Sequence, residues 1–158
     1  MAVNYTEVDA TNLDQWCQPV RDFSKSLDVE LRCNAAAVAR QKWDLTYPSF
    51  SMIREFVDRD ALVVVAHDGD EVVGYLICTD DRDRKYGGCY CRWIGLKDLP
   101  PEEMSDIYSS MGDIAVEKYG WLWGRVSNTD IRNFMINFID GCELGIDGDD
   151  QIVTYKKP

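Results

Sequence analysis

Residues 117–132 of the sequence, EKYGWLWGRVSNTDIR, decide the order of elements in the C-terminal half of the chain. Gly120 follows an apolar helical repeat, and glycine is favoured just beyond a helix C-terminus. The aromatic and apolar run at 121–127 predicts a strand. One of the polar residues at 128–130 then caps a second helix, which Gly141 ends. The stretch therefore predicts a helix, a strand and a helix in that order.

The first of these helices begins at two prolines. Residues 100–103 are Pro-Pro-Glu-Glu; proline is tolerated in the first turn of a helix, and acidic residues there favour the helix dipole. Apolar residues then follow at helical spacing, namely Ile107, Met111, Ile114 and Ala115. We therefore predict one helix from the prolines to Gly120.

Three strands are predicted in the stretch directly before the prolines. The apolar run 62–66, the turn at Asp68-Gly69 and the returning run 71–79 make a β-hairpin. Residues 80–85 carry alternating charges without an apolar anchor, which predicts an exposed loop. Residues 88–96 then predict the third strand.

The N-terminal third is predicted to be mostly helical. After a short edge strand at 3–8, Thr11 and Asp14 resemble a capping box for a helix at 12–27. A shorter helix is expected at 49–57. Between them, in the segment 29–60, a second helix is expected through Leu31, Ala35, Val38 and Ala39.

The order of the elements and the size of the chain suggest one α/β (α+β) domain. The turn at Asp147-Gly148 marks a last hairpin, and residues 151–155 predict the final strand. The whole order predicts a mixed sheet with helices on both faces. Because 158 residues with 46% hydrophobic content can bury one sizeable core, we expect a single domain spanning 1–158.

The net charge of the chain narrows the choice of partners. There are 28 acidic and 17 basic residues, which give a formal net charge of −11. Such a surface repels phosphate, so sequence-independent nucleic-acid binding is not expected. The acidic balance suits a basic partner, and it suits plain solubility equally well.

Cysteine spacing and hydropathy argue against a metal site and a membrane segment. The six cysteines contain no C-x-x-C pair, and the sequence has a single histidine, His67. Zinc sites need clustered ligands, so no metal is expected. No apolar run approaches membrane-spanning length and no secretory signal is present, so we expect reduced thiols in a cytosol.

The order of elements resembles the GNAT N-acyltransferase fold, most clearly over residues 112–157. The resemblance implies a mainly antiparallel central sheet in which an asparagine, here Asn128, begins the last helix. Residues 117–132 also resemble the small GNAT-like internal virion or assembly proteins of T7-like podoviruses. That second resemblance implies a phage protein that acts in virion assembly, located in the virion or the host cytoplasm. Its partners would be other phage structural proteins, with a homo-oligomer possible.

The loop that binds coenzyme A in that family departs from the expected pattern. The resemblance implies a glycine-rich loop whose backbone N–H groups point at the diphosphate. Residues 95–103 instead contain two prolines, three carboxylates and no glycine beyond Gly95. Diphosphate binding of the usual kind is therefore not expected. If acyl-CoA does bind, the resemblance places Ile94, Gly95, Leu96 and Asn128 at its site.

The proton-transfer residues of the family are also not found. The resemblance implies a tyrosine acid seven residues after the helix-starting asparagine, and this position holds Met135, which cannot donate a proton. Candidates for a general base on the central strands are His67, Asp80, Asp81 and Tyr90, of which His67 is better explained as a solvated residue at a strand end. No catalytic residue is assigned.

The third strand and the aromatic strand supply the remaining candidates. Cys89, Cys91 and Trp93 alternate along one strand and are expected on one face, with the two thiols as small buried residues. Large aromatic residues carry binding energy where they are exposed, so four of them are candidate interface anchors: Tyr90, Trp93, Trp121 and Trp123.

Three functions remain open at the level of sequence. The favoured hypothesis is a catalytically degenerate GNAT-fold protein that acts through protein contacts in virion assembly, without a cofactor. The alternative is an active N-acetyltransferase that uses acetyl-CoA through a divergent loop. The third is a regulatory protein whose acidic surface occupies a basic host factor.

Overall fold

The computed structural model describes residues 1–27, 32–34, 50–126 and 129–156. Its centre is a sheet of eight strands, seven of them in the order β1-β3-β4-β5-β6-β8-β7, with β2 paired to β5 beside that path. The strands are β1 (Asn4–Glu7), β2 (Arg32–Asn34), β3 (Leu62–Asp68), β4 (Glu71–Asp80), β5 (Cys89–Leu96), β6 (Leu122–Arg125), β7 (Cys142–Leu144) and β8 (Ile152–Tyr155). The helices are α1 (Leu13–Ser26), α3 (Phe50–Asp58), α4 (Pro101–Tyr119) and α5 (Thr129–Phe138), with a 3-10 turn η3 (Ile146–Gly148).

The sheet is mixed and mainly antiparallel, as the sequence predicted. Among the described strands, β5 and β6 form the one parallel pair, and α4 makes the crossover between them. Their registered pairing covers only Cys89 with Leu122 and Tyr90 with Trp123. The remainder of β5, up to Leu96, is therefore not paired to β6.

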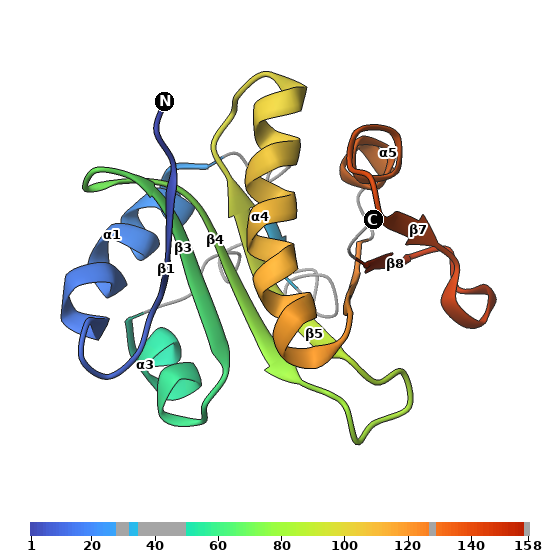
Figure 1. Cartoon of the computed structure of the whole chain (residues 1–158), viewed down its shortest axis with the longest axis horizontal. Coiled ribbons are helices and arrows are strands. Elements are labelled where there is room, and N and C mark those ends of the chain that lie inside the picture. Colours follow the sequence, from blue (N-terminus) through green and yellow to red (C-terminus); the bar gives the residue numbers. More distant parts are fainter. Residues whose placement is uncertain (28–31, 35–49, 127–128, 157–158) are drawn as a thin grey trace.

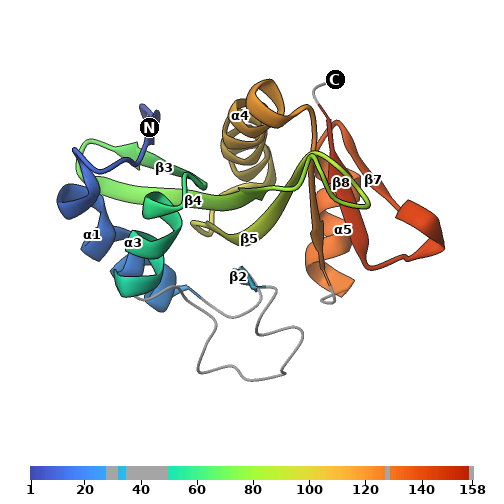
Figure 2. The same cartoon turned by 90° about the horizontal axis from the view of Figure 1, so that it is seen from below.

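Helices cover both faces of the sheet (Figures 1 and 2). On one face, α1 and α3 pack on alternate residues of β3 and β4, such as Val63, Val65 and Tyr75. On the other face, α4 packs on Val64 and Leu76, and α5 joins the same core. This division follows from the strand period of two, which sends successive side chains to opposite faces.

A β-bulge changes the alternation of side chains along β5. Ile77 of β4 pairs with Trp93, whereas the next residue, Cys78, pairs with Cys91, so Arg92 is an extra residue on β5. A bulge shifts the residues beyond it to the other face. Cys89 accordingly lies in the α4 core and Trp93 in the α1–α3 core. The prediction that Cys89, Cys91 and Trp93 share one face is wrong for Trp93.

The hairpin and the helix that starts at the prolines are confirmed. Asp68 and Glu71 pair across a two-residue turn in which Gly69 has a φ of +57°, a value that glycine adopts without strain. Helix α4 begins at Pro101 and Gly120 follows it, also at positive φ. Strand β1 lies at the sheet edge, and α3 matches the helix expected at 49–57.

The segment between α1 and α3 and the start of α1 differ from the predictions. Residues 32–34 form strand β2, not a helix; the predicted helical residues Leu31, Ala35, Val38 and Ala39 lie outside the described residues. The capping box is also wrong, because the Thr11 N–H and hydroxyl both donate to the Asp9 carboxylate. Asn12 occupies the N-cap position without a side-chain cap bond.

Candidate functional site

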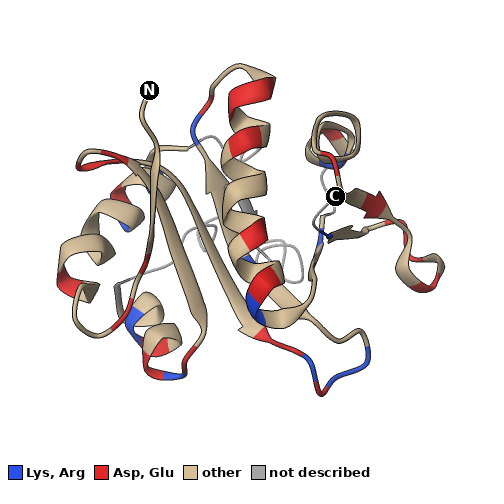
Figure 3. Ribbon diagram, in the orientation of Figure 1, with Lys and Arg blue, Asp and Glu red and all other residues tan. Residues whose placement is uncertain are grey.

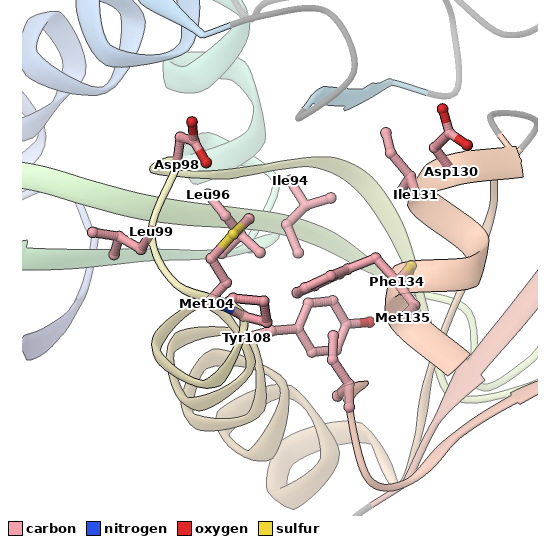
Figure 4. Close-up of a pocket in the computed structure, with 12 residues that line it drawn as sticks. Ile94, Leu96, Asp98, Leu99, Met104, Tyr108, Asp130, Ile131, Phe134 and Met135 are labelled. Carbon is pink, nitrogen blue, oxygen red and sulfur yellow. The ribbon is translucent and has the colours of Figure 1, made fainter. Parts of the chain in front are cut away.

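An apolar cleft of about 360 Å³ opens between β5, α4 and α5. It lies beside the part of β5 that β6 does not pair, so the separation of these two strands leaves space between the helices that follow them. Figure 4 shows side chains from all three elements directed into this space. The cleft is lined by Ile94, Leu96, Asp98, Leu99, Pro101, Met104, Tyr108, Asp130, Ile131, Phe134, Met135 and Ile139.

Among the described residues that line the cleft, Tyr108 is the one with a hydroxyl group. It is only 6% exposed, and Figure 4 shows its ring crossing the cleft toward Phe134 and Met135 of α5. The Tyr108 hydroxyl is hydrogen-bonded to the thiol of Cys142, whose pKa burial nevertheless raises to about 12. A phenol held at the wall of an apolar cleft can donate a proton to a bound group.

Tyr155 of β8 holds α4 in the position that shapes the cleft. Its ring packs edge-on against Tyr108, with centroids 5.5 Å apart, and its hydroxyl donates to Asp113 Oδ1 at 2.6 Å. Burial and this carboxylate raise the pKa of Tyr155. Gly112 faces the same ring, and a Cβ at that position would lie 2.7 Å from it. The helix can approach β8 this closely because position 112 has no side chain.

The mouth of the cleft is acidic. Asp98, on the loop between β5 and α4, and Asp130, in the first turn of α5, are both exposed and stand on opposite sides of the opening (Figure 4). Glu102 and Glu103 lie exposed in the first turn of α4, and acidic residues continue along this helix (Figure 3). The neighbouring Lys97 is bound to Glu71 at 2.8 Å. Within the described lining there is no cationic side chain.

The residues that the resemblance placed at an acyl-CoA site are partly brought together. Ile94 and Leu96 line the cleft. Gly95 lies between them and faces the other way, since a Cβ there would come 2.5 Å from the ring of Tyr75. Asn128 lies outside the described residues.

The predicted base candidates do not line the cleft. The His67 ring is bonded to the Thr6 hydroxyl and the Gly69 carbonyl oxygen, both at 2.8 Å, beside the turn between β3 and β4. Hydrogen bonds from Arg82 lower the pKa of Asp80 to about 2, so this carboxylate has little tendency to take a proton. Met135, which occupies the position of the family's tyrosine, does line the cleft and lies close to Tyr108 in Figure 4.

The four aromatic residues predicted as interface anchors differ in exposure. Trp93 and Trp123 are only 4% and 8% exposed, so neither can serve as a surface anchor. Two contacts hold Trp123 in this buried position. Its Nε1 donates to the Gly87 carbonyl oxygen at 3.1 Å, and the Tyr90 ring packs on its ring, with centroids 4.6 Å apart. Tyr90 and Trp121 are half-buried, and their role as anchors stays a prediction.

Sequence reasoning missed Tyr108. The signal was present, since Met104, Tyr108 and Met111 recur at spacings of four and three and are all buried on one face of α4. What the spacing could not show is that this face borders a cleft at Tyr108. That depends on the position of α5, which is distant in sequence.

Strand β2 occupies the edge of β5 next to the cleft. It pairs antiparallel with β5, with Cys33 opposite Ile94 and Asn34 opposite Trp93. The backbone at this part of β5 is therefore hydrogen-bonded to the chain itself. A ligand that used the same edge would have to displace β2.

The residues that the structure describes contain neither a metal cluster nor a membrane-spanning helix. Within them, no three His, Cys, Asp or Glu side chains group closely enough to hold a metal ion. No helix in the same part of the chain is both long and apolar enough to cross a bilayer.

The fold has clear structural relatives, although no family model and no curated protein sequence matches the chain. PaiA N-acetyltransferase from Thermoplasma acidophilum, in complex with coenzyme A, matches with a TM-score of 0.58 at 16% identity, over 99% of both chains. An N-acetyltransferase from Staphylococcus aureus matches with a TM-score of 0.61 at 10% identity, over 98% of this chain and 95% of the other. Naa50 from Arabidopsis thaliana, in complex with a bisubstrate analogue, matches with a TM-score of 0.58 at 15% identity, over 99% of both chains. Because these similarities extend over nearly the whole chain, the protein has the GNAT N-acetyltransferase fold.

Proposed function

We propose that the protein is an N-acyltransferase that binds an acyl thioester in the cleft between β5, α4 and α5. The observation that carries this proposal is the cleft itself, which is apolar and open at the point where β5 and β6 separate. Unfilled apolar space costs packing energy, and a domain that served only as a scaffold would gain by closing it. The structural relatives over nearly the full chain include N-acetyltransferases, which supports the same proposal.

The side chains of the cleft suit the two proton movements of acyl transfer. The thioester supplies an activated carbonyl carbon; as the amine nitrogen bonds to it, the carbon–sulfur bond breaks. The amine loses a proton to water at the open mouth, where Asp98 and Asp130 favour a cation. The leaving sulfur takes a proton from the Tyr108 hydroxyl, which regains one from solvent through the cleft.

Replacing Tyr108 with Phe tests the assigned proton donor. Loss of a general acid typically lowers the rate about 10²–10⁴-fold, so kcat should fall by this order with little change in KM. The measurement is thiol release from a thioester in the presence of an amine, followed over pH. A purely structural role for the hydroxyl would instead lower the stability and leave the pH profile of kcat unchanged, and this would contradict the assignment.

Filling the cleft tests whether it is the binding site. Ile131 is half-buried, lines the cleft and stands near the mouth in Figure 4. The larger side chain of Ile131→Trp should occupy the space and weaken thioester binding by at least about tenfold, measured by calorimetry. Phe138→Trp is the matched control, because Phe138 lies on the same helix, is 52% exposed and does not line the cleft. Equal binding by both variants would place the ligand elsewhere.

A second candidate is a protein that acts through contacts alone, in virion assembly or an internal virion complex. Two observations favour it: the described lining offers no histidine as a base, and β2 already pairs with the β5 edge beside the cleft. The structural relatives described above do not support a role in a virion, so the phage assignment rests on the sequence resemblance alone. Detection of this chain in purified phage particles would support this candidate. Thiol release in the assay above would exclude a degenerate site.

A further inference from the structure

The entrance of the cleft does not suit the nucleotide half of coenzyme A. In CoA-type sites the diphosphate needs free backbone N–H groups at a helix N-terminus or nearby cations. Here Pro100 and Pro101 have no N–H, and the Glu103 N–H is already bonded to the Pro100 carbonyl oxygen at 3.0 Å. Of residues 100–103, only Glu102 keeps an N–H outside these bonds.

The charges around the entrance also disfavour the binding of a diphosphate. The exposed carboxylates of Asp98 and Asp130 flank the mouth, and those of Glu102 and Glu103 lie on the adjoining turn. The one cation on this loop, Lys97, is paired with Glu71 at Nζ–Oε1 2.8 Å. A diphosphate at the mouth would therefore meet like charge from these carboxylates, and the described residues that line the cleft include no cationic side chain.

The interior of the cleft, in contrast, favours an apolar ligand. It is lined by buried and half-buried aliphatic, methionine and aromatic side chains, and the Tyr108 hydroxyl is the one polar group inside it among the described residues. Its volume of about 360 Å³ is near the lower end of ligand pockets, which span roughly 300–1,000 Å³. A slender, largely apolar and uncharged molecule suits this interior.

We infer that the ligand of the cleft is an acyl thioester that lacks a nucleotide, such as an acyl-pantetheine. This inference rests on the proposed function and defines its donor substrate. The acyl group and the thioester enter the apolar interior, the pantetheine amides lie toward the open mouth, where water can hydrogen-bond them, and the end of the molecule that reaches Asp98 and Asp130 carries no phosphate. The same two carboxylates favour the cationic amine acceptor at the mouth.

The test compares S-acetylpantetheine with acetyl-CoA on the full chain, by calorimetry and by thiol release with an amine. At about 50 mM salt, acetylpantetheine should bind at least as tightly as acetyl-CoA. Raising the salt to about 500 mM should strengthen acetyl-CoA binding, because screening weakens the repulsion, and leave acetylpantetheine binding nearly unchanged.

Two charge-neutralising substitutions distinguish the effect of the carboxylates at the mouth from the effect of the net charge of the chain on acetyl-CoA affinity. In the double variant Asp98→Asn/Asp130→Asn, acetyl-CoA affinity at low salt should rise about three- to tenfold, with little effect on acetylpantetheine. The matched control is Asp58→Asn/Glu143→Gln. It also removes two negative charges, but at exposed positions on α3 and β7. The control should leave the ratio of the two affinities as in the unchanged chain.

The outcomes distinguish the inference from the proposed function. Acetyl-CoA binding about tenfold tighter than acetylpantetheine, with thiol release, would overturn the inference and leave the acyltransferase in place. Failure of both thioesters to bind or react would overturn the proposed function, and the inference with it. Equal or tighter binding of acetylpantetheine, with the reversed salt dependence of acetyl-CoA, supports both.

Discussion

Raising the pH from 9 to 11 is expected to lower the free energy of unfolding by several kcal/mol. Burial raises the pKa of Cys17 to about 11 and that of Cys142 to about 12, from an ordinary thiol value of 9.0. The pKa of Cys78 is also raised, by its hydrogen bond with Cys89 and by burial. Burial raises the pKa of Tyr119 to about 12.

The free energy of unfolding falls with pH because the folded state keeps the protons of these groups longer than the unfolded state does. Above pH 9 these thiols ionise in the unfolded chain and stay protonated in the folded one, so the unfolded state is favoured as pH rises. Each such group contributes about 1.4 kcal/mol per pH unit between its unfolded and folded pKa values. Two or three groups together give about 3–6 kcal/mol by pH 11, comparable to the total stability of many domains.

Urea unfolding under reducing conditions, followed by circular dichroism at pH values from 7 to 11, measures this effect. The stability should be nearly constant up to pH 8.5 and then fall steeply. The variant Cys17→Ala/Cys142→Ala should show a shallower fall, since two of the ionising thiols are gone. A stability that stayed level to pH 11 in the unchanged chain would contradict the buried, protonated state of these thiols.

Replacing Gly141 with Ala is expected to destabilise the protein by about 2–5 kcal/mol. Gly141 follows α5 with a φ of +93°, a region that alanine enters only with strain. A Cβ there would also clash with the Lys156 carbonyl oxygen, which is backbone and cannot rotate away. Because Ile139 and α5 border the cleft, thioester binding should weaken together with stability.

Gly145→Ala is the matched control for this substitution. Gly145 has the same φ of +93°, yet nothing lies within 4 Å of the position of its Cβ. It should therefore show the torsional cost alone, about 1–2 kcal/mol. The difference in urea midpoints between the two variants measures the contact with Lys156. Equal costs would mean that this close contact is absent in solution.

Much of the fold could be predicted because its signals are local. The turn at Asp68-Gly69 with its apolar flanks predicts the β3–β4 hairpin, and the two prolines with Gly120 delimit α4. Positive φ at Gly69 and at Gly120 is a property of glycine itself, independent of distant contacts. Strand β2 was missed because three residues of extended chain carry little signal of their own and are strand only through pairing with β5.

The candidate site was predictable only in part. Ile94 and Leu96 were placed at the cleft through the resemblance, whereas Tyr108 was not. The acidic, proline-containing loop was apparent in the sequence, but its position opposite Asp130 was not. Such relations depend on the packing of α4 against α5, and no local pattern records the distance between two helices.

The sequence by itself determined the order of strands and helices, the acidic loop before α4 and the absence of a tyrosine at position 135, since these depend on residue type and near neighbours. The tertiary structure alone decided which face each β5 side chain takes, because the bulge at Arg92 arises from pairing with β4. It also decided that Tyr108, rather than a residue of α5, brings a hydroxyl to the cleft. A cavity exists only where elements distant in the chain fail to fill the space between them, so it could emerge only from the folded arrangement.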